Sequence, residues 1–463
     1  MILQKCVINR KYIDCKDMYY RGDYQIVGDG VFVEKGNEVT TDTYMNIFDY
    51  SIYQKYTLVA DVYFEITYRG NANIALVYEK EDGETKELKV SGRTAVPRDW
   101  TDGIIYFRFQ ALDDSVITGA SFGTITEPRK VVNLSSIICT FKRERNLFEL
   151  IDIIKKSDHK IHIYVIDNAK SIKGHNDEYV HIYPNTNCGG SGGFSKGMDK
   201  IIDNHNLNKS DYVILMDDDV LTDAEMFNRL VAFLSFIKRE YRNKYIAGRM
   251  LNILKPWIQY TSCEKWNGGT IEHINHNMDL SDRKNLFCVN NSIGGEYSGW
   301  WLACYPYSVI QKHRPLPFFL HCDDVEFGLR LKDSPIILNG VHVWHKIPDD
   351  KGENYFNYYD MRNAMIVNSI YNPSDFRGQY EFFKSKIGPL HAARNYTGEY
   401  LAILGMNDYL RGKSRFLKTD SEKHHNRIMR ISARKHSRYI NMLLWRITAV
   451  KLRLKCNHIS YDL

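Results

Sequence analysis

The sequence predicts an α/β protein with a doubly wound, nucleotide-binding sheet at its centre, and three observations support this fold class. Two nearly continuous apolar runs, 131–139 and 161–166, flank a segment with helical spacing, which is the pattern of a β-α-β unit. A third apolar run, 213–216, ends in three consecutive aspartates. All three runs are followed by polar residues, and ligands of such sheets bind outside the carboxyl ends of the strands.

Composition places the chain among globular proteins. Its 463 residues are 44% hydrophobic and 25% charged, which is enough for two or three domains with hydrophobic cores. Nine scattered cysteines without a Cys-x-x-Cys pair argue against a disulfide framework or a zinc site and favour a reducing compartment. We find no signal peptide and no apolar run of membrane-spanning length. We therefore expect a cytoplasmic protein.

Residues 1–128 are predicted to form a β-sandwich or barrel. Segments 57–68, 74–78 and 104–109 are rich in β-branched and aromatic residues, and turn residues such as those at 69–71 separate them. Many small sandwiches bind sugars on aromatic faces. The alternative, that the aromatic residues form the core, is favoured about two to one.

The strand ends of residues 129–370 carry the candidate binding residues. The first strand is followed by Thr140 and Arg143, and the second ends in Asp167 and Asn168. A guanidinium group suits a diphosphate, and a carboxylate accepts hydrogen bonds from a base or a ribose. Together with the aspartates at 217–219 after the third strand, these make three polar strand ends at one edge of a sheet, which predict a nucleotide site.

The aspartate triplet predicts a metal site. On an extended segment Asp217 and Asp219 point to one side and Asp218 to the other. Two carboxylates on one side suit a hard divalent cation that keeps positions open for phosphate oxygens. The alternative for an isolated triplet is an acidic loop.

A glycine-rich segment at 185–197 lies between the second and third strands. It lacks the ending of a Walker loop and the spacing of a dinucleotide fingerprint. We expect its glycines to allow close approach to a ligand, with a helix starting near Gly193 that offers free N–H groups.

These motifs together resemble the bacterial galactofuranosyltransferases that build cell-wall galactan, which are inverting enzymes of the GT-A fold in glycosyltransferase family 2. The resemblance runs from about residue 137 to 365, and the β-rich start and helical end also look like that family's layout. The GT-A similarity rests on many motifs, and the galactofuranose similarity mainly on Gly-Gly-Ser-Gly-Gly-Phe, two tryptophans and a Trp-His pair. The motifs, in chain order, lie at 139–143, 165–168, 189–194, 216–220, 297–306, 323–330 and 343–345.

The resemblance implies a role for each matching residue on the donor side. Arg143 would lie near the diphosphate and Asp167 near the uracil. Asp217, Asp219 and His345 would bind Mn²⁺ or Mg²⁺, with His342 as a nearby competitor for the third ligand. The positions implied for the nucleotide sugar are Thr140, Phe141, Arg143, Asp167, Asn168, Gly192, Asp217 and Asp218.

On the acceptor side the resemblance implies that Asp324 is the catalytic base, which takes the proton of the attacking hydroxyl. It favours Asp324 over Asp323 about three to one, and the pair also suits the start of a helix. Asp323, Tyr297, Trp300 and Trp301 would bind the acceptor, with one of the tryptophans facing the sugar if both lie on a strand. Cys322 and the Ile347-Pro348 pair depart from the family pattern, so we expect a different acceptor.

The third predicted part, 371–463, is helical and basic. Residues 409–463 contain 14 lysines and arginines and 3 acidic residues, whereas the net charge of the whole chain is only +6. Segments 426–435 and 439–455 have the pattern of basic amphipathic helices, which attach to anionic membranes, with Trp445 at the interface. An ordinary packed helical region is equally consistent, and no nucleic-acid recognition motif is present.

The sequence therefore predicts a metal-dependent inverting glycosyltransferase, which moves a sugar from UDP-galactofuranose to a surface glycan or a lipid-linked acceptor. It leaves open UDP-galactopyranose, UDP-glucose or dTDP-rhamnose as the donor, and a non-catalytic glycan-binding scaffold. It also leaves open a peripheral position on the inner face of the cell membrane, and whether the chain forms a homo-oligomer.

Overall fold

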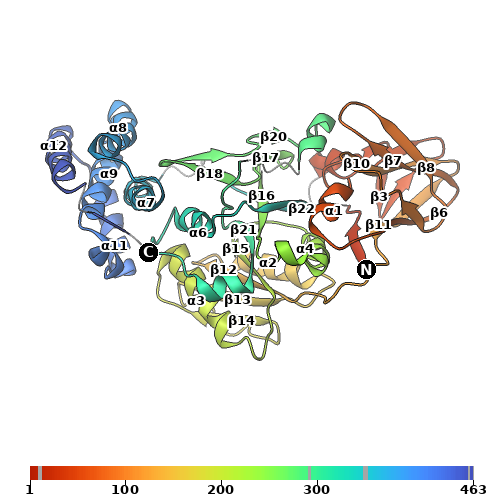
Figure 1. The fold of residues 1–463 in the computed structure, drawn as a ribbon, viewed down its shortest axis with the longest axis horizontal. Helices are drawn as coiled ribbons and strands as arrows, with labels where there is room; N and C mark the ends of the chain where they lie inside the picture. The colour runs from red at the N-terminus through yellow and green to blue at the C-terminus, as the bar shows by residue number, and fades with distance from the viewer. Residues whose placement is uncertain (9–12, 290–293, 348–352, 457–458, 462–463) are drawn as a thin grey trace.

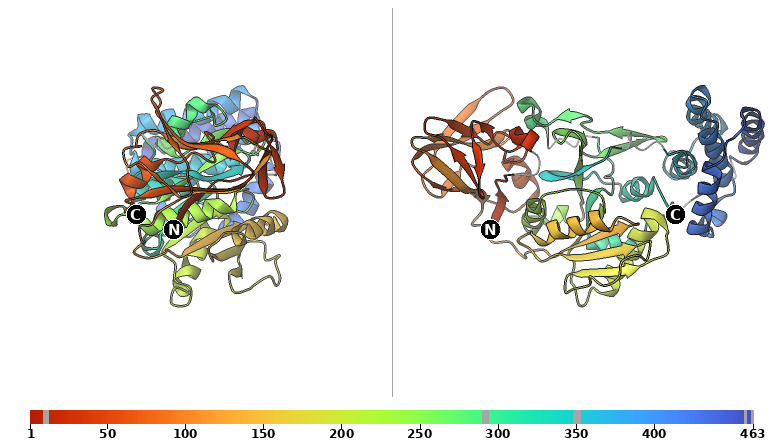
Figure 2. Two further views of the ribbon diagram at one scale, coloured as in Figure 1. Left: turned by 90° about the vertical axis from the view of Figure 1, so that its right-hand side faces the viewer. Right: turned by 180° about the vertical axis from the view of Figure 1, so that it is seen from behind.

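The structure is a computed structural model that describes residues 1–463 except 9–12, 290–293, 348–352, 457–458 and 462–463. Two β-sheets lie at one end of the molecule, a mixed sheet with helices lies in the middle, and a group of helices lies at the other end (Figures 1 and 2). The predicted α/β fold class is confirmed: a domain in which helices cover a mixed sheet follows a β-sandwich and precedes a helical region. Among the described helices, none is long and apolar enough to cross a membrane.

The N-terminal sandwich consists of two antiparallel sheets, ordered β3-β4-β11-β6-β9 with β1 beside β11, and β2-β5-β10-β7-β8. Its aromatic residues fill the space between the sheets, because Phe64, Phe107 and Phe122 have no exposed surface. The strands are β1 Ile2–Lys5, β2 Arg21–Gly22, β3 Gln25–Val27, β4 Gly30–Val33, β5 Glu38–Thr40, β6 Val62–Arg69, β7 Ala72–Glu79, β8 Thr85–Lys89, β9 Thr94–Val96, β10 Ile104–Ala111 and β11 Ser115–Gly123, with the helices η1 Ile13–Met18 and α1 Tyr50–Tyr56 between them.

The central sheet has the order β14-β13-β12-β15-β21-β16-β17-β20, with β22 beside β16. Strands β14, β13, β12 and β15 are parallel, so their carboxyl ends meet at one edge, and β21 is antiparallel to its two neighbours. Its strands are β12 Leu134–Thr140, β13 His162–Asp167, β14 Val180–Pro184, β15 Tyr212–Asp217, β16 Ile246–Asn252, β17 Ile258–Thr261, β20 Met278–Asp279, β21 Leu302–Pro306 and β22 Ile336–His345; β18 Glu264–Asn267 and β19 Thr270–His273 form a separate pair.

Helices cover both faces of this sheet, which explains why its strands are continuously apolar. Ile138 and Ile214 pack on one face with helices α2 and α4, and Ile137 and Val213 pack on the other with α3, α5 and α6. The helices of this part are α2 Glu144–Lys155, α3 Gly189–Asp203, α4 Ala224–Phe236, η2 Arg239–Tyr241, η3 Arg283–Cys288, α5 Tyr307–Lys312 and α6 Asp323–Leu331.

The C-terminal helices share a separate core, in which α9 lies between α7, α8, α11 and α12. Trp445 is partly buried and packs against this core near Tyr380, and its expected position at a membrane interface stays a prediction. Helix α7 lies almost entirely before the predicted domain boundary at residue 370, yet it packs on α9 of the C-terminal group. The boundary itself stays a prediction. The helices are α7 Phe356–Tyr371, α8 Phe376–Ala392, α9 Tyr396–Tyr409, α10 Lys413–Leu417, α11 Ser421–Ser432 and α12 Arg438–Lys455.

Candidate active site

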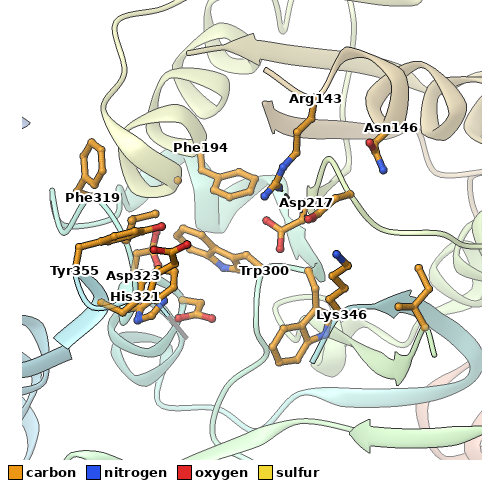
Figure 3. Close-up of a pocket in the computed structure, with 18 residues that line it drawn as sticks. Arg143, Asn146, Phe194, Asp217, Trp300, Phe319, His321, Asp323, Lys346 and Tyr355 are labelled. Atoms are coloured by element: carbon orange, nitrogen blue, oxygen red, sulfur yellow. Dashed lines mark ion pairs between the residues drawn. The ribbon is translucent and has the colours of Figure 1, made fainter. Parts of the chain in front are cut away.

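A cavity of about 800 Å³ lies beyond the carboxyl edge of the central sheet (Figure 3). The pairing of β12 with its neighbours places Thr140 beside Asp167 and Cys139 beside Asp217, so these strand ends are level. Trp300 lies between Asp217 on one side of the cavity and Asp323 on the other (Figure 3). The predicted site residues that line it are Arg143, Asp217, Asp219, Trp300, Trp301, Asp323 and Asp324.

The three predicted metal ligands come together. One ligand atom from each of Asp217, Asp219 and His345 lies within 4.8 Å of the others. Asp217 ends β15, Asp219 lies just after it, and His345 ends β22. His345 Nε2 lies 3.0 Å from Asp219 Oδ1 and 4.0 Å from Asp217 Oδ2. Two carboxylates and one imidazole are a donor set that suits Mn²⁺ and, less well, Mg²⁺. The residues present therefore fit a divalent cation.

The competitor His342 is excluded from this group by its position. Its side chain is 1% exposed and packs against Tyr44 of the sandwich and against Trp344. Burial, together with the positive charges of Arg229 and Arg249, lowers the pKa of His342 to about 3. It is a neutral core residue.

Arg143 connects the end of β12 with the acidic triplet. Its guanidinium lies 2.9 Å from a carboxylate oxygen of Asp218 and 2.9 Å from one of Asp219. Asp218 is 3% exposed, and burial raises the pKa of its carboxyl, although Thr140 and Arg143 act in the opposite direction. Asp218 therefore lies beneath Arg143 rather than on the cavity wall, and it holds the guanidinium at the cavity.

The polar side chains at the end of β13 are hydrogen-bonded to other residues of the protein. Asp167 accepts hydrogen bonds from the backbone N–H groups of Ala169 and Ile172, at 2.9 and 2.8 Å. The Asn168 amide donates to Gly189 O at 3.0 Å, and its oxygen accepts from Asn185. Both side chains are at most 5% exposed. Their contacts with a nucleotide, like those of Thr140, Phe141 and Gly192, stay predictions, because none of these residues is among those that line the cavity.

The glycine-rich run is part of a helix. Helix α3 begins at Gly189, four residues earlier than expected, and the glycines allow it to lie close on the sheet. A Cβ atom on Gly193 would lie 2.2 Å from Cys139 Sγ, and one on Gly197 would lie 2.3 Å from Ile137 Cγ2. Only Gly190 of the run reaches the cavity, where a Cβ would lie 3.4 Å from Asp323 Oδ2.

The acidic pair begins helix α6 and also lines the cavity, so the reading as a helix start is confirmed and the site role stays a prediction. Cys322 precedes the helix with a φ of 66°, and Phe319 and His321 also have positive φ angles. Such conformations are rare for non-glycine residues and occur where a side chain must be aimed at a site. This turn presents the acidic pair to the cavity.

Burial by the surrounding protein raises the pKa of both Asp323 and Asp324. The neighbouring charge of Asp323 raises that of Asp324 further. A carboxylate with a raised pKa is a stronger base than an ordinary aspartate, which suits proton abstraction from a hydroxyl group.

The two tryptophans lie in the turn before β21, not on the strand, so the expectation that they point to opposite sides does not apply. Both line the cavity. The Trp300 ring is 4% exposed and is held edge-on by Phe194 and Phe327, at ring distances of 5.0 and 5.5 Å. Trp301 donates from its indole to Gly248 O at 2.8 Å. Each ring therefore has a fixed orientation.

Tyr297, in contrast, is misassigned by the sequence. Its side chain is completely buried, and a Cβ on Gly328 of helix α6 would lie 2.3 Å from Tyr297 Cβ. It packs behind the acidic pair and has no surface for contact with an acceptor. Of the departures from the family pattern, Cys322 lies at the turn before α6, while Pro348 lies outside the described residues.

The structure adds cavity residues that the sequence did not indicate. His321 hydrogen-bonds Asp360 and stacks on Phe356, with ring centroids 4.6 Å apart. Burial lowers the pKa of His321, but the carboxylates of Asp360, Asp323 and Asp324 outweigh this and raise it. In the sequence, the one feature that could have pointed to His321 as a cavity residue was its position just before the acidic pair. The other additions are Asn146, Phe194, Ile253, Phe319, Leu320, Lys346, Glu353, Tyr355 and Phe356.

Comparison with known proteins confirms the resemblance found in the sequence. The chain is similar to galactofuranosyltransferase GlfT2 of Mycobacterium tuberculosis, with 22% identity over 382 residues, 72% of this chain and 59% of the relative. GlfT2 of Mycolicibacterium smegmatis is 25% identical over 210 residues, 42% of this chain and 32% of the relative. The chain thus spans less than two thirds of these relatives. No family model matches the chain.

Among solved structures, Staphylococcus aureus TarS matches 70% of this chain and 54% of its own, with a TM-score of 0.38 and 10% identity. The Pyrobaculum calidifontis mannosyltransferase PcManGT, in complex with GDP-Man and Mn²⁺, matches 72% and 90%, with a TM-score of 0.34 and 11% identity. Both likenesses are too distant to assign a function.

Proposed function

We propose that this protein transfers galactofuranose from UDP-galactofuranose to a hydroxyl group of a surface glycan or a lipid-linked acceptor, with inversion at the anomeric carbon. One observation carries the proposal: the metal-ligand group Asp217, Asp219 and His345 and the acidic pair Asp323–Asp324 lie on two sides of one cavity, with an aromatic ring between them. The similarity to galactofuranosyltransferases supports the choice of sugar and donor.

The donor side of the cavity is suited to a diphosphate. A Mn²⁺ or Mg²⁺ ion held by Asp217, Asp219 and His345 would offset the charge of the leaving UDP. Arg143 and Lys346 also line the cavity and bring positive charge to the same place. Asp218 holds the Arg143 side chain in this position.

The acceptor side supplies the base. The acceptor oxygen forms a bond to the anomeric carbon while the bond from that carbon to the UDP oxygen breaks, and the hydroxyl proton passes to Asp324. Trp300, held by its neighbours, offers a fixed apolar surface to the C–H groups of a sugar. His321, Tyr355 and Phe356 line the acceptor side as well, where their rings suit a second sugar.

The test is incubation of the full chain and Mn²⁺ with UDP-galactofuranose, UDP-galactopyranose, UDP-glucose or dTDP-rhamnose and a panel of oligosaccharide and lipid-linked acceptors, with products read by mass spectrometry. We expect a gain of one hexose with UDP-galactofuranose, loss of the product in Arg143→Ala, and retention in the control Arg145→Ala, whose side chain is 91% exposed. Preferred use of another donor would overturn the choice of sugar. Binding of glycan without transfer from any donor would favour a glycan-binding scaffold.

A further inference from the structure

Four helical elements of the C-terminal region each bring an arginine to one small pocket, which we call the arginine pocket. Its arginines are Arg362 of α7, Arg411 just after α9, Arg415 of α10 and Arg427 of α11. These residues are far apart along the chain, so the cluster is a product of the fold rather than a run of surface charges on one helix.

The positive charge of the arginine pocket is not balanced. Among the described residues that line it, Asp408 is the only acid, and it lies 2.9 Å from the Arg411 guanidinium. Arg362 is 6% exposed, and its side-chain hydrogen bonds go to neutral groups. Arg415 and Arg427 form no ion pair within the described part of the chain. Four guanidinium groups and one carboxylate leave an excess of three positive charges.

The pKa of His424, which also lines this pocket, reflects the same imbalance. Its Nε2 atom lies 3.7 Å from a carboxylate oxygen of Asp408, an arrangement that by itself favours the protonated imidazole. Burial and the charge of Arg362 nevertheless lower the pKa of His424 to about 4. Arg427 and Arg415 act in the same direction. His424 is therefore neutral, and Asp408 does not cancel the field of the arginines.

A phosphate group is the ligand that this arrangement suits. Guanidinium groups bind phosphate oxygens through paired N–H donors, and Thr419 adds a hydroxyl group to the wall. The pocket has a volume of about 20 Å³, which is room for about one water-sized group. One end of a phosphate group would therefore enter it, while the exposed side chains of Arg411, Arg415 and Arg427 contact the remaining oxygens.

Helix α11 connects the arginine pocket with the acceptor side of the cavity. His425, the neighbour of His424, stacks on Phe319 with ring centroids 4.4 Å apart and meets Tyr355 edge-on at 5.8 Å. Phe319 and Tyr355 both line the cavity. Arg143 and the metal-ligand group line the cavity but not the arginine pocket, so the pocket is distinct from the place proposed for the donor diphosphate.

We propose that the arginine pocket binds a phosphate group of a second anionic ligand, apart from the nucleotide sugar. That group belongs either to a phosphorylated glycan acceptor or to free phosphate or diphosphate in solution. The first source rests on the proposed function, whereas binding itself is measured without donor and metal. Failure of this proposal can therefore be told apart from failure of sugar transfer.

The test is calorimetric titration of the full chain with inorganic pyrophosphate in EDTA, which keeps divalent cations out of the donor side. We expect binding that weakens with salt and raises the melting temperature. Arg415→Gln with Arg427→Gln should weaken binding at least about tenfold. The His424 imidazole, followed by NMR, should titrate at a higher pH with pyrophosphate bound, because the anion offsets the charge of the arginines.

Matched controls separate the pocket from general attraction of anions. Arg438→Gln with Arg453→Gln removes two exposed arginines of α12, and Arg143→Ala removes the arginine of the donor side. Both controls should bind pyrophosphate like the wild type. Equal binding by the Arg415→Gln, Arg427→Gln variant, or no binding by the wild type, would overturn the proposal. A lower melting temperature of that variant without ligand would also count against it, because loss of like charges should not destabilise an unbalanced cluster.

A second titration identifies the source of the phosphate group, with galactose 1-phosphate, galactose and inorganic phosphate as probes. Tighter binding of galactose 1-phosphate than of either other probe would assign the pocket to a phosphorylated acceptor. Equal binding of the two phosphates, with none of galactose, would assign it to free phosphate. Binding of galactose as tight as that of its phosphate would contradict a phosphate site.

Discussion

At the scale of single residues, the proposed function assigns proton abstraction to Asp324, which lines the cavity. Substitution with Asn keeps the shape of the side chain and removes its ability to accept a proton. We expect turnover to fall by about 10²–10⁴-fold, with UDP affinity within a few-fold of the wild type. Initial rates and calorimetric UDP titration would measure both. A variant with wild-type turnover would show that Asp324 is not the base.

The raised pKa of Asp324 predicts two pH effects of opposite direction. Transfer needs the ionised carboxylate, so the rate should fall as pH drops through the raised pKa, closer to neutrality than for an ordinary aspartate of pKa about 3.9. Folding instead favours the protonated form. The wild type should therefore gain free energy of unfolding as pH falls through the same range.

The variant Asp324→Asn supplies the control for this stability effect, since it has no proton to exchange there. It should be more stable than the wild type above the raised pKa, and the advantage should shrink on acidification towards the unfolded pKa. Urea unfolding at several pH values measures the difference. A stability difference that does not depend on pH would contradict the raised pKa.

At the scale of elements, the metal-ligand group depends on two strand ends that are far apart in sequence, those of β15 and β22. Asp219→Ala removes one of the three proposed ligands and should weaken Mn²⁺ binding at least about tenfold by calorimetry. UDP affinity should then lose its dependence on metal. The control Asp152→Ala removes an exposed acid of α2 and should bind Mn²⁺ normally. Identical Mn²⁺ binding by both variants would exclude Asp219 as a ligand.

Helix α3 shows a second dependence between elements, because it lies on β12 through its glycines. Gly193→Ala places a methyl group 2.2 Å from Cys139 Sγ, so we expect a loss of about 1–3 kcal/mol of unfolding free energy. Gly388→Ala in α8 is the matched control, since no atom lies within 4 Å of its added Cβ, and it should stabilise the protein by about 0.4–1 kcal/mol. Equal effects in denaturant melts would contradict close packing of α3.

The same elements show what the sequence could predict. Asp217, Asp219 and Asp324 follow or begin regular elements, so apolar periodicity and family motifs located them. Tyr297 lies in an equally good motif, but only the packing of α6 shows that it is buried. His321 hydrogen-bonds Asp360, 39 residues later in the chain, and no local pattern encodes that contact. Residues placed by tertiary contacts were therefore missed or misassigned.

At the scale of the whole molecule, the sandwich is joined to the central sheet through buried polar contacts. Arg229 of α4 is 2% exposed and donates hydrogen bonds to Met45 O at 2.8 Å and Lys5 O at 3.1 Å. Glu225 lies 3.7 Å from the same guanidinium and accepts from Lys5 N. Hydrophobic packing continues across the junction, where the Tyr53 ring contacts Phe233. The predicted division at residue 128 thus falls within continuous packing.

This continuity predicts that the sandwich and the central domain unfold together. Arg229→Ala leaves Glu225 and two backbone carbonyls buried without their partner, which should cost about 3–5 kcal/mol of unfolding free energy. Because those carbonyls belong to the sandwich and Arg229 to the central domain, the loss should lower one shared transition in differential scanning calorimetry. The exposed Arg239→Ala is the control and should leave the transition in place. A separate sandwich transition at an unchanged temperature would show instead that the chain divides at residue 128 into independently stable units.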